Sequence, residues 1–228
     1  MNYSKNRAKA IEAINKAGCL LVFPLDNRPE PASIWSALYP RREMRWEWDA
    51  GADGRVSNLW ILREELARSR EVVYCKWYQN RATFFSQEVF IWMLAYLESP
   101  SGQLALSSPS MEALDTLLID SPQSTKVLKE NLSWQGKLME SHYNRALKPL
   151  WNQLFLVGYG EVDDSSFPSL NIGAAETLFE ELWVQAKKIP SSKAEKLLEK
   201  KLGAESLFFK FAQKIKKSQQ KIELEQFD

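Results

Sequence analysis

The sequence has few of the residues that build metal and catalytic centres. Among 228 residues it contains one histidine, His142, and two cysteines, Cys19 and Cys75, whose separation fits no metal-ligand motif. These counts exclude a histidine-rich metal site, and we predict that the protein holds no metal and no other cofactor. Both cysteines lie in apolar stretches, which predicts buried, reduced thiols. His142 stands beside the polar face of a predicted helix, and we expect a surface or capping residue rather than a general base.

The sequence also lacks the motifs of nucleotide hydrolysis, dinucleotide binding and serine hydrolysis. No Walker sequence, GxGxxG or GxSxG occurs in it. It has no run of about 20 apolar residues, the length that a membrane span requires. The first residues are polar and charged, unlike a signal peptide. We therefore expect a cytoplasmic protein without a membrane partner.

Charge is spread unevenly along the chain. The net charge is +1, yet the segment from Lys187 to Lys221 contains eleven lysines and three glutamates, a local net charge of +8. The remainder is therefore net acidic. A basic C-terminal region can approach a polyanion, although a lysine-rich helix that only improves solubility explains the same pattern. The hydrophobic content of 45%, with nine tryptophans, indicates a folded globular protein.

The segment 110–162 contains three helix signals and then a strand signal. The first helix has Ser110 as its N-cap and ends at Asp120-Ser121-Pro122, and the second has Ser124 or Thr125 as its N-cap. A third helix starts at Lys137. A strand follows from Phe155 to Tyr159, with Gly160 as its turn. Two short helices, a third helix and a strand that opens a wing are typical of a winged helix-turn-helix.

The third helix of this segment has two different faces. Four apolar residues, Tyr143, Leu147, Leu150 and Leu154, recur at helical spacing and predict a buried face. The polar side offers cations and hydrogen-bonding groups that suit phosphates and base edges, and we predict these nucleic-acid contacts: Lys137, Ser141, Asn144, Arg145, Lys148 and Asn152. A solvated helix face is the plain alternative. Pro149 predicts a kink or a break.

The rest of the chain predicts a mainly α-helical α+β fold with small β-hairpins. Helices are expected over residues 6–16, 57–67 and 87–98, and a hairpin over residues 72–85. Proline, serine and glycine are dense from Pro100 to Pro109, which predicts a flexible join. We predict three units: an N-terminal winged-helix-like unit (1–103), a central winged helix-turn-helix (104–170), and a helical C-terminal extension (171–228) whose tail frays after Ser218.

Arginines alternate with tryptophans in one further stretch. Its members are Arg41, Arg42, Arg45, Trp46 and Trp48. Such a mixture can stack on unpaired bases or hold phosphates. However, Glu43, Glu47 and Asp49 cancel the local charge, and tryptophans in such a place also cover the edge of a core. Both interpretations stay open from the sequence.

Several of these stretches resemble a known family. The run AIEAINKAGCLLVFP, the segment IWSAL, the Trp46-x-Trp48 pair, the hairpin VVYCKWYQNRATFFS and the P-x-S-T and N-R-A-L signals look like the short bacterial AlkZ-related winged-helix DNA-binding proteins. These are related to DNA glycosylases that excise alkylated and crosslinked bases. The resemblance covers about residues 10–202 and implies tandem winged-helix units, a helical C-terminal extension and DNA binding.

The resemblance does not carry catalysis to this chain. Glycosylases of that family position a water with two glutamines that are separated by one residue, and no two glutamines of this chain have that spacing. We therefore predict a double-stranded DNA-binding protein without catalytic residues, linked to DNA repair. One alternative is a divergent glycosylase that uses an acid such as Glu88 or Asp163. The other is a protein–protein interaction module whose helices bury an aromatic surface.

Overall fold

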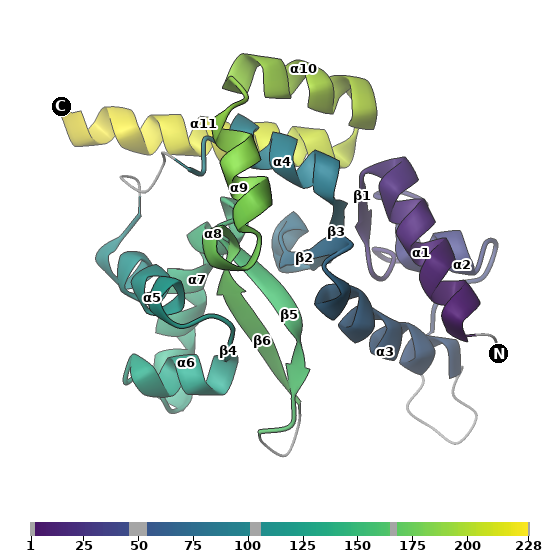
Figure 1. Ribbon diagram of the computed structural model, residues 1–228, viewed down its shortest axis with the longest axis horizontal. Coiled ribbons are helices and arrows are strands. Elements are labelled where there is room, and N and C mark those ends of the chain that lie inside the picture. The colour runs from purple at the N-terminus through teal and green to yellow at the C-terminus, as the bar shows by residue number, and fades with distance from the viewer. Residues whose placement is uncertain (1–2, 46–53, 101–105, 165–167, 228) are drawn as a thin grey trace.

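The computed structural model describes residues 3–45, 54–100, 106–164 and 168–227 (Figure 1). In the N-terminal half the elements are α1 (Tyr3–Ala17), β1 (Cys19–Leu21), α2 (Ile34–Leu38), α3 (Gly54–Ser69), β2 (Val72–Lys76), η1 (Tyr78–Asn80), β3 (Ala82–Ser86) and α4 (Gln87–Tyr96). The element η1 is a turn of 3-10 helix between two paired strands. The hairpin expected over residues 72–85 is therefore confirmed.

The C-terminal half adds further helices and three strands. Its elements are α5 (Ser108–Ile119), β4 (Gln123–Ser124), α6 (Thr125–Asn131), η3 (Lys137–Met139), α7 (Glu140–Asn152), β5 (Leu156–Val162), β6 (Ser169–Ala174), α8 (Ala175–Leu178), α9 (Glu180–Lys187), α10 (Ser191–Leu202) and α11 (Leu207–Phe227). The protein is thus mainly helical with a small antiparallel sheet, which is an α+β fold.

One antiparallel sheet runs through both halves of the chain (Figure 1). Its strand order is β1-β3-β2-β5-β6-β4, and β2 meets β5 where Tyr74 pairs with Gly158. Each side of this junction repeats one order of elements: helix, strand, helix, helix, strand, strand. Strands of the predicted units 1–103 and 104–170 therefore share a sheet, and its strand β6 continues past residue 170 to Ala174. Whether either unit folds alone stays a prediction.

The junction between β2 and β5 requires a glycine. A Cβ atom on Gly158 would lie 2.1 Å from Cδ1 of Tyr74, far inside van der Waals contact. The Tyr74 side chain is 1% exposed and packs edge-on against Phe84, with ring centroids 5.2 Å apart. It therefore has little room to move aside. A residue without a side chain lets the two strands pair at this point.

A buried ion pair crosses the same junction. The guanidinium of Arg63 on α3 binds the carboxylate of Glu161 on β5, and the two side chains are 7% and 11% exposed. Arg63 also donates to the Tyr74 hydroxyl at 3.4 Å and lies 4.1 Å from the ring centroid of Trp60. The ion pair holds α3 against β5, a strand of the other half of the chain.

Serine hydroxyls cap the N-termini of three helices, α2, α4 and α6. Ser33, Ser86 and Ser124 each accept a hydrogen bond from the backbone N–H three residues later, as N-cap residues do. The N-cap prediction for Ser110 is wrong, because α5 begins before it. The buried Ser110 hydroxyl instead donates to the carbonyl of Ala146 on α7 at 2.8 Å. A capping serine and a serine that joins two helices look alike in a sequence.

Two predictions around α7 also need correction. We expected a kink or a break at Pro149; the break does not occur, because α7 continues to Asn152, and the kink stays a prediction. Pro149 has no N–H to donate to the carbonyl of Arg145, so α7 lacks that one hydrogen bond and still continues to its end. Gly160 is not the turn of the hairpin but a residue inside β5, with φ +85°, next to an irregular register between Gly158 and Glu161. A glycine in this conformation forms a β-bulge.

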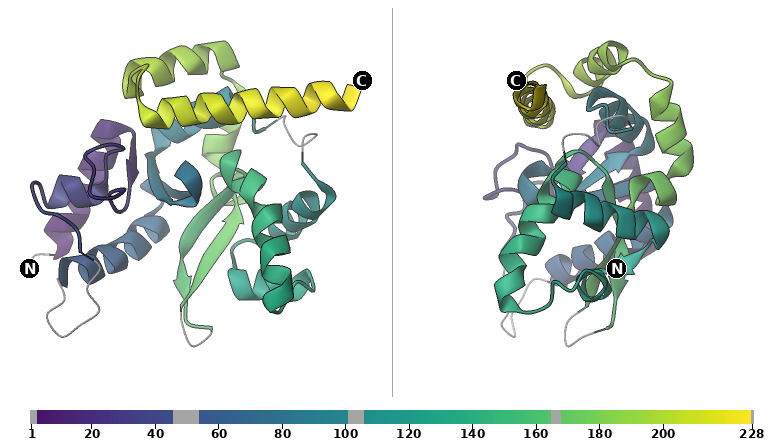
Figure 2. Two further views of the ribbon diagram at one scale, coloured as in Figure 1. Left: turned by 180° about the vertical axis from the view of Figure 1, so that it is seen from behind. Right: turned by 90° about the vertical axis from the view of Figure 1, so that its left-hand side faces the viewer.

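The last helix lies against the end of α4. The ammonium of Lys216 donates to the carbonyl of Tyr96 at 2.7 Å, and the amide of Gln219 donates to the carbonyl of Leu97 at 3.5 Å. Figures 1 and 2 show α11 as a long rod beside α10 at one end of the molecule. The helix α11 runs to Phe227, and the fraying expected from Ser218 onward stays a prediction. Gln219 is 8% exposed, so α11 is packed against the protein at this position.

Both cysteines are buried and free, as predicted. Burial raises the pKa of the Cys19 thiol and that of the Cys75 thiol well above the usual value. None of the helices in the described ranges is long and apolar enough to cross a membrane.

Candidate nucleic-acid interface

The structure places the six predicted contact residues along one helix and the turn before it. Lys137 lies in η3, and the others follow on α7. Five of the six are exposed: Lys137, Ser141, Asn144, Arg145 and Lys148. Asn152 is half-buried at the end of the helix. The polar face is therefore a physical surface of the protein, and its contact with DNA stays a prediction.

The cations on this face are available to a ligand. Within the described part of the chain, no ion pair involves Lys137, Arg145 or Lys148. The one side-chain hydrogen bond among them is local, from Nε of Arg145 to the carbonyl of Ser141 at 3.4 Å. The acid at the start of α7, Glu140, instead pairs with a lysine of α6 at 2.6 Å. The face therefore carries unneutralised positive charge.

Side chains from other elements fix the position of α7. The expected apolar face is buried, with Leu147 4% exposed and Leu150 0% exposed. The indole N–H of Trp77, which follows β2, donates to the carbonyl of Asn152 at 3.0 Å. The hydroxyl of Ser99 donates to the carbonyl of Gln153. Since donors of the N-terminal half hold its C-terminal end, α7 is a rigid support for the residues on its exposed face.

His142 packs at the beginning of α7 rather than pointing into a cleft. Its ring lies edge-on to Trp134, with ring centroids 4.6 Å apart, and the residue is half-buried. This arrangement suits a residue that packs α7 against the loop between α6 and η3. We derive no acid–base step from it.

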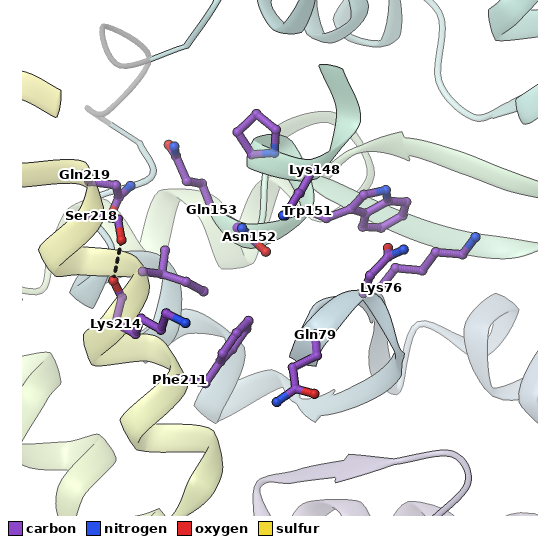
Figure 3. A pocket seen from close by; sticks show the side chains of 13 residues that line it. Lys76, Gln79, Lys148, Trp151, Asn152, Gln153, Phe211, Lys214, Ser218 and Gln219 are labelled. Carbon is purple, nitrogen blue, oxygen red and sulfur yellow. Dashed lines mark hydrogen bonds between the residues drawn. The ribbon is translucent and has the colours of Figure 1, made fainter. Parts of the chain in front are cut away.

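A cleft opens where the exposed face of α7 ends (Figure 3). Its volume is about 530 Å³. Three elements line it: the end of α7, the turn between β2 and β3, and the middle of α11. Figure 3 shows Lys214 and Phe211 of α11 on one wall, facing Asn152 of α7 across the gap. The predicted contacts Lys148 and Asn152 belong to this lining.

Only part of the basic C-terminal region is open to a ligand. Four of its lysines form ion pairs: Lys187 with Glu176, Lys201 with Glu88, Lys210 with Glu205, and Lys216 with Glu98. Lys214, by contrast, forms no ion pair within the described ranges and lines the cleft. A shallow groove on α11 continues from it past Lys217 and Ser218. Charge count alone therefore overstates the free positive charge.

The other sequence candidates lie elsewhere. Trp46 and Trp48 fall outside the described residues, and the nearby Arg42 uses its carbonyl to accept the indole N–H of Trp35 at 2.8 Å. Glu88 is exposed at the start of α4, 3.8 Å from the ammonium of Lys201. Asp163 is exposed after β5. Neither acid lines the cleft.

No part of the described chain gathers metal ligands. Among residues 3–45, 54–100, 106–164 and 168–227, no group of three or more histidines, cysteines or acids is placed to hold a metal ion. The exposed face of α7 offers lysine, arginine, amide and hydroxyl groups instead.

The sequence matches one family model over most of its length. That model is described as AlkZ related, and the match covers residues 4–217. It extends from the start of α1 into α11 and includes all of α7 and the cleft lining except Ser218 and Gln219. Comparison with curated proteins and with solved structures gives no match. The chain therefore belongs to the AlkZ-related family.

Proposed function

We propose that this protein binds double-stranded DNA through the exposed face of α7 and catalyses no base excision. The family points to a link with DNA repair. The observation that carries the proposal is the pair of cations Arg145 and Lys148, one turn apart on α7, which have no carboxylate partner among the residues that the structure describes. Free lysine and arginine side chains bind DNA phosphates and release the bound counterions, and the nearby amide and hydroxyl groups suit base edges.

The order of elements around α7 supports the same proposal. In a winged helix, two short helices precede a recognition helix, and a β-hairpin follows it. The elements α5, β4, α6, α7, β5 and β6 have this order, with β6 between β5 and β4 in the sheet. We propose that they form a winged helix with α7 as the recognition helix. The elements α1 to β3 repeat the order, which supports a tandem of two winged helices.

The first of these units is the less suitable DNA reader. Its third helix, α3, uses Arg63 in the buried ion pair with Glu161. Arg68 pairs with Glu64 at 2.8 Å on the same helix. The exposed face of α3 instead shows Trp60, which is 45% exposed. We therefore assign DNA contact to α7 and a structural role to α3.

The proposal that the protein excises no base rests on which acids and glutamines the chain has and where they lie. A glycosylase must place a water or a carboxylate against the sugar of the target nucleotide. The two acids considered for that role, Glu88 and Asp163, lie outside the cleft beside α7. The paired glutamines of the related glycosylases are missing from the sequence. We therefore expect no abasic product from duplexes that carry alkylated purines or a crosslink.

Binding to labelled DNA tests the proposal directly. Fluorescence anisotropy with a random-sequence duplex of about 20 base pairs should give saturable binding that weakens as salt rises, because phosphate contacts release counterions. The same duplex with an alkylated purine should bind but gain no abasic site on incubation. Absence of duplex binding at low salt would refute the proposed function. An abasic product that disappears in Glu88→Gln or Asp163→Asn would replace it with the glycosylase alternative.

A further inference from the structure

The cleft beside α7 has the charge of an anion-binding site. Thirteen side chains line it, three of them from lysines, and none from an acid. Lys148 and Lys214 stand on different walls, are exposed, and form no ion pair within the described ranges. A volume of about 530 Å³ falls within the roughly 300–1,000 Å³ of small-molecule pockets. A nucleotide fits such a space, whereas a duplex does not.

One wall of the cleft offers an aromatic ring to a planar ligand. Phe211 is half-buried, and its ring is fixed by Trp77 and Tyr78, with ring centroids 5.0 Å and 5.1 Å away. Trp151 and Ile215 add further apolar surface to the lining. Any nucleobase can stack on an aromatic side chain, whatever the DNA sequence, because every base has a flat face. The cleft thus combines cations with an apolar platform.

An unused hydrogen-bonding atom lies in the same lining. Oε1 of Gln153 is buried and has no hydrogen-bond partner among the described residues, and the residue is 5% exposed. The backbone of Gln153 is fixed by the hydrogen bond from Ser99 to its carbonyl. A buried acceptor without a donor is unfavourable, and a ligand N–H group would satisfy it. The ring and amino N–H groups of nucleobases are such donors.

The cleft also continues the proposed DNA-binding face. Lys148 and Asn152 belong both to that face and to the lining. The spacing from Arg145 to Lys148 and on to Asn152 follows one side of α7 toward the opening. A strand held by the first two residues would therefore have its next nucleotide beside the cleft.

From these observations we propose that the cleft between α7, the β2–β3 turn and α11 binds one unpaired nucleotide of the DNA. Lys148 and Lys214 contact its phosphate, Phe211 supports its base, and Gln153 accepts a hydrogen bond from the base edge. This inference rests on the proposed function, because α7 brings the DNA to the cleft. The nucleotide comes either from inside a duplex or from a strand end, and both sources share this chemistry.

Three fluorescent duplexes of one sequence test the inference: a fully paired duplex, one with a single unpaired nucleotide in the middle, and one with a short overhang. The wild-type protein should bind an unpaired nucleotide about tenfold more tightly than the paired duplex, a factor typical of one base stacked on an aromatic ring. With 2-aminopurine as the unpaired base, its fluorescence should change on binding. Preference for the internal nucleotide or for the overhang identifies the source.

Two cleft variants and one control show whether this cleft is responsible. Lys214→Ala, at an exposed position, and Gln153→Leu should each reduce the preference to about twofold or less. Lys193→Ala removes an exposed lysine of α10 and should leave it unchanged. Equal binding of all three duplexes, or a preference that survives both cleft variants, would overturn the inference while the proposed function stands. Binding of unpaired nucleotides without binding of the paired duplex would refute the proposed function and support the cleft.

Discussion

Substitution Gly158→Ala tests the packing at the junction of the two halves of the sheet. The added Cβ would lie 2.1 Å from Cδ1 of Tyr74, whereas two carbon atoms in contact are roughly 3.5–4.0 Å apart. The strands β2 and β5 must therefore separate by more than an ångström, or the buried ring must leave its place against Phe84. Forcing atoms into a packed core costs about 1–3 kcal/mol of unfolding free energy.

Urea denaturation, followed by the fluorescence of the nine tryptophans, measures this cost. Gly54→Ala is a matched control, because a Cβ there meets no atom within 4 Å. We expect the control to stay within about 0.5 kcal/mol of wild type. In a Tyr74→Ala background, Gly158→Ala should lose most of its effect, because the clashing ring is gone. An equal cost of Gly158→Ala in both backgrounds would refute this account of the junction.

Two further predictions concern buried groups. Arg63→Met leaves the carboxylate of Glu161, 11% exposed, without its partner and should lower the unfolding free energy by about 3–5 kcal/mol. Adding Glu161→Gln should restore much of the loss in urea denaturation, and an equally unstable double variant would contradict the ion-pair account. Because burial raises the pKa of the Cys19 and Cys75 thiols, both stay protonated at pH 8 and should not react with a thiol reagent until urea unfolds the chain. Rapid labelling of the native protein would contradict this.

The sequence predicted those elements whose signals are local. The apolar spacing of Tyr143 and Leu147 gave the buried face of α7, and Ser124 gave the start of α6, because helix periodicity and capping depend on neighbours within a few residues. Local signals failed where the same residue type suits two different structural roles. Ser110 resembled an N-cap but bonds to another helix, and Gly160 resembled a turn but forms a bulge.

Long-range features could not be predicted from these patterns. The β2–β5 pairing depends on the close approach of Tyr74 and Gly158, which are far apart in the chain. The short strand β4 has only two residues, too few for a periodic signal. The exposed face of α7 could be predicted from the spacing of residues within one helix. The cleft could not, because Gln79 and Lys214, which also line it, come from two other segments of the chain. Helical spacing identifies a face, but it does not show which distant side chains lie opposite.

The central claim is that cations on α7 contact DNA phosphates. The most direct test is the affinity for one duplex, measured by fluorescence anisotropy over a range of salt concentrations. We expect Arg145→Ala/Lys148→Ala to weaken binding to all sequences and to lower the slope of log affinity against log salt by roughly two units, at about 0.9 per phosphate contact. The charge-matched control Lys193→Ala/Lys196→Ala, on exposed positions of α10, should keep the wild-type slope. An unchanged slope in the α7 variant would contradict the claim.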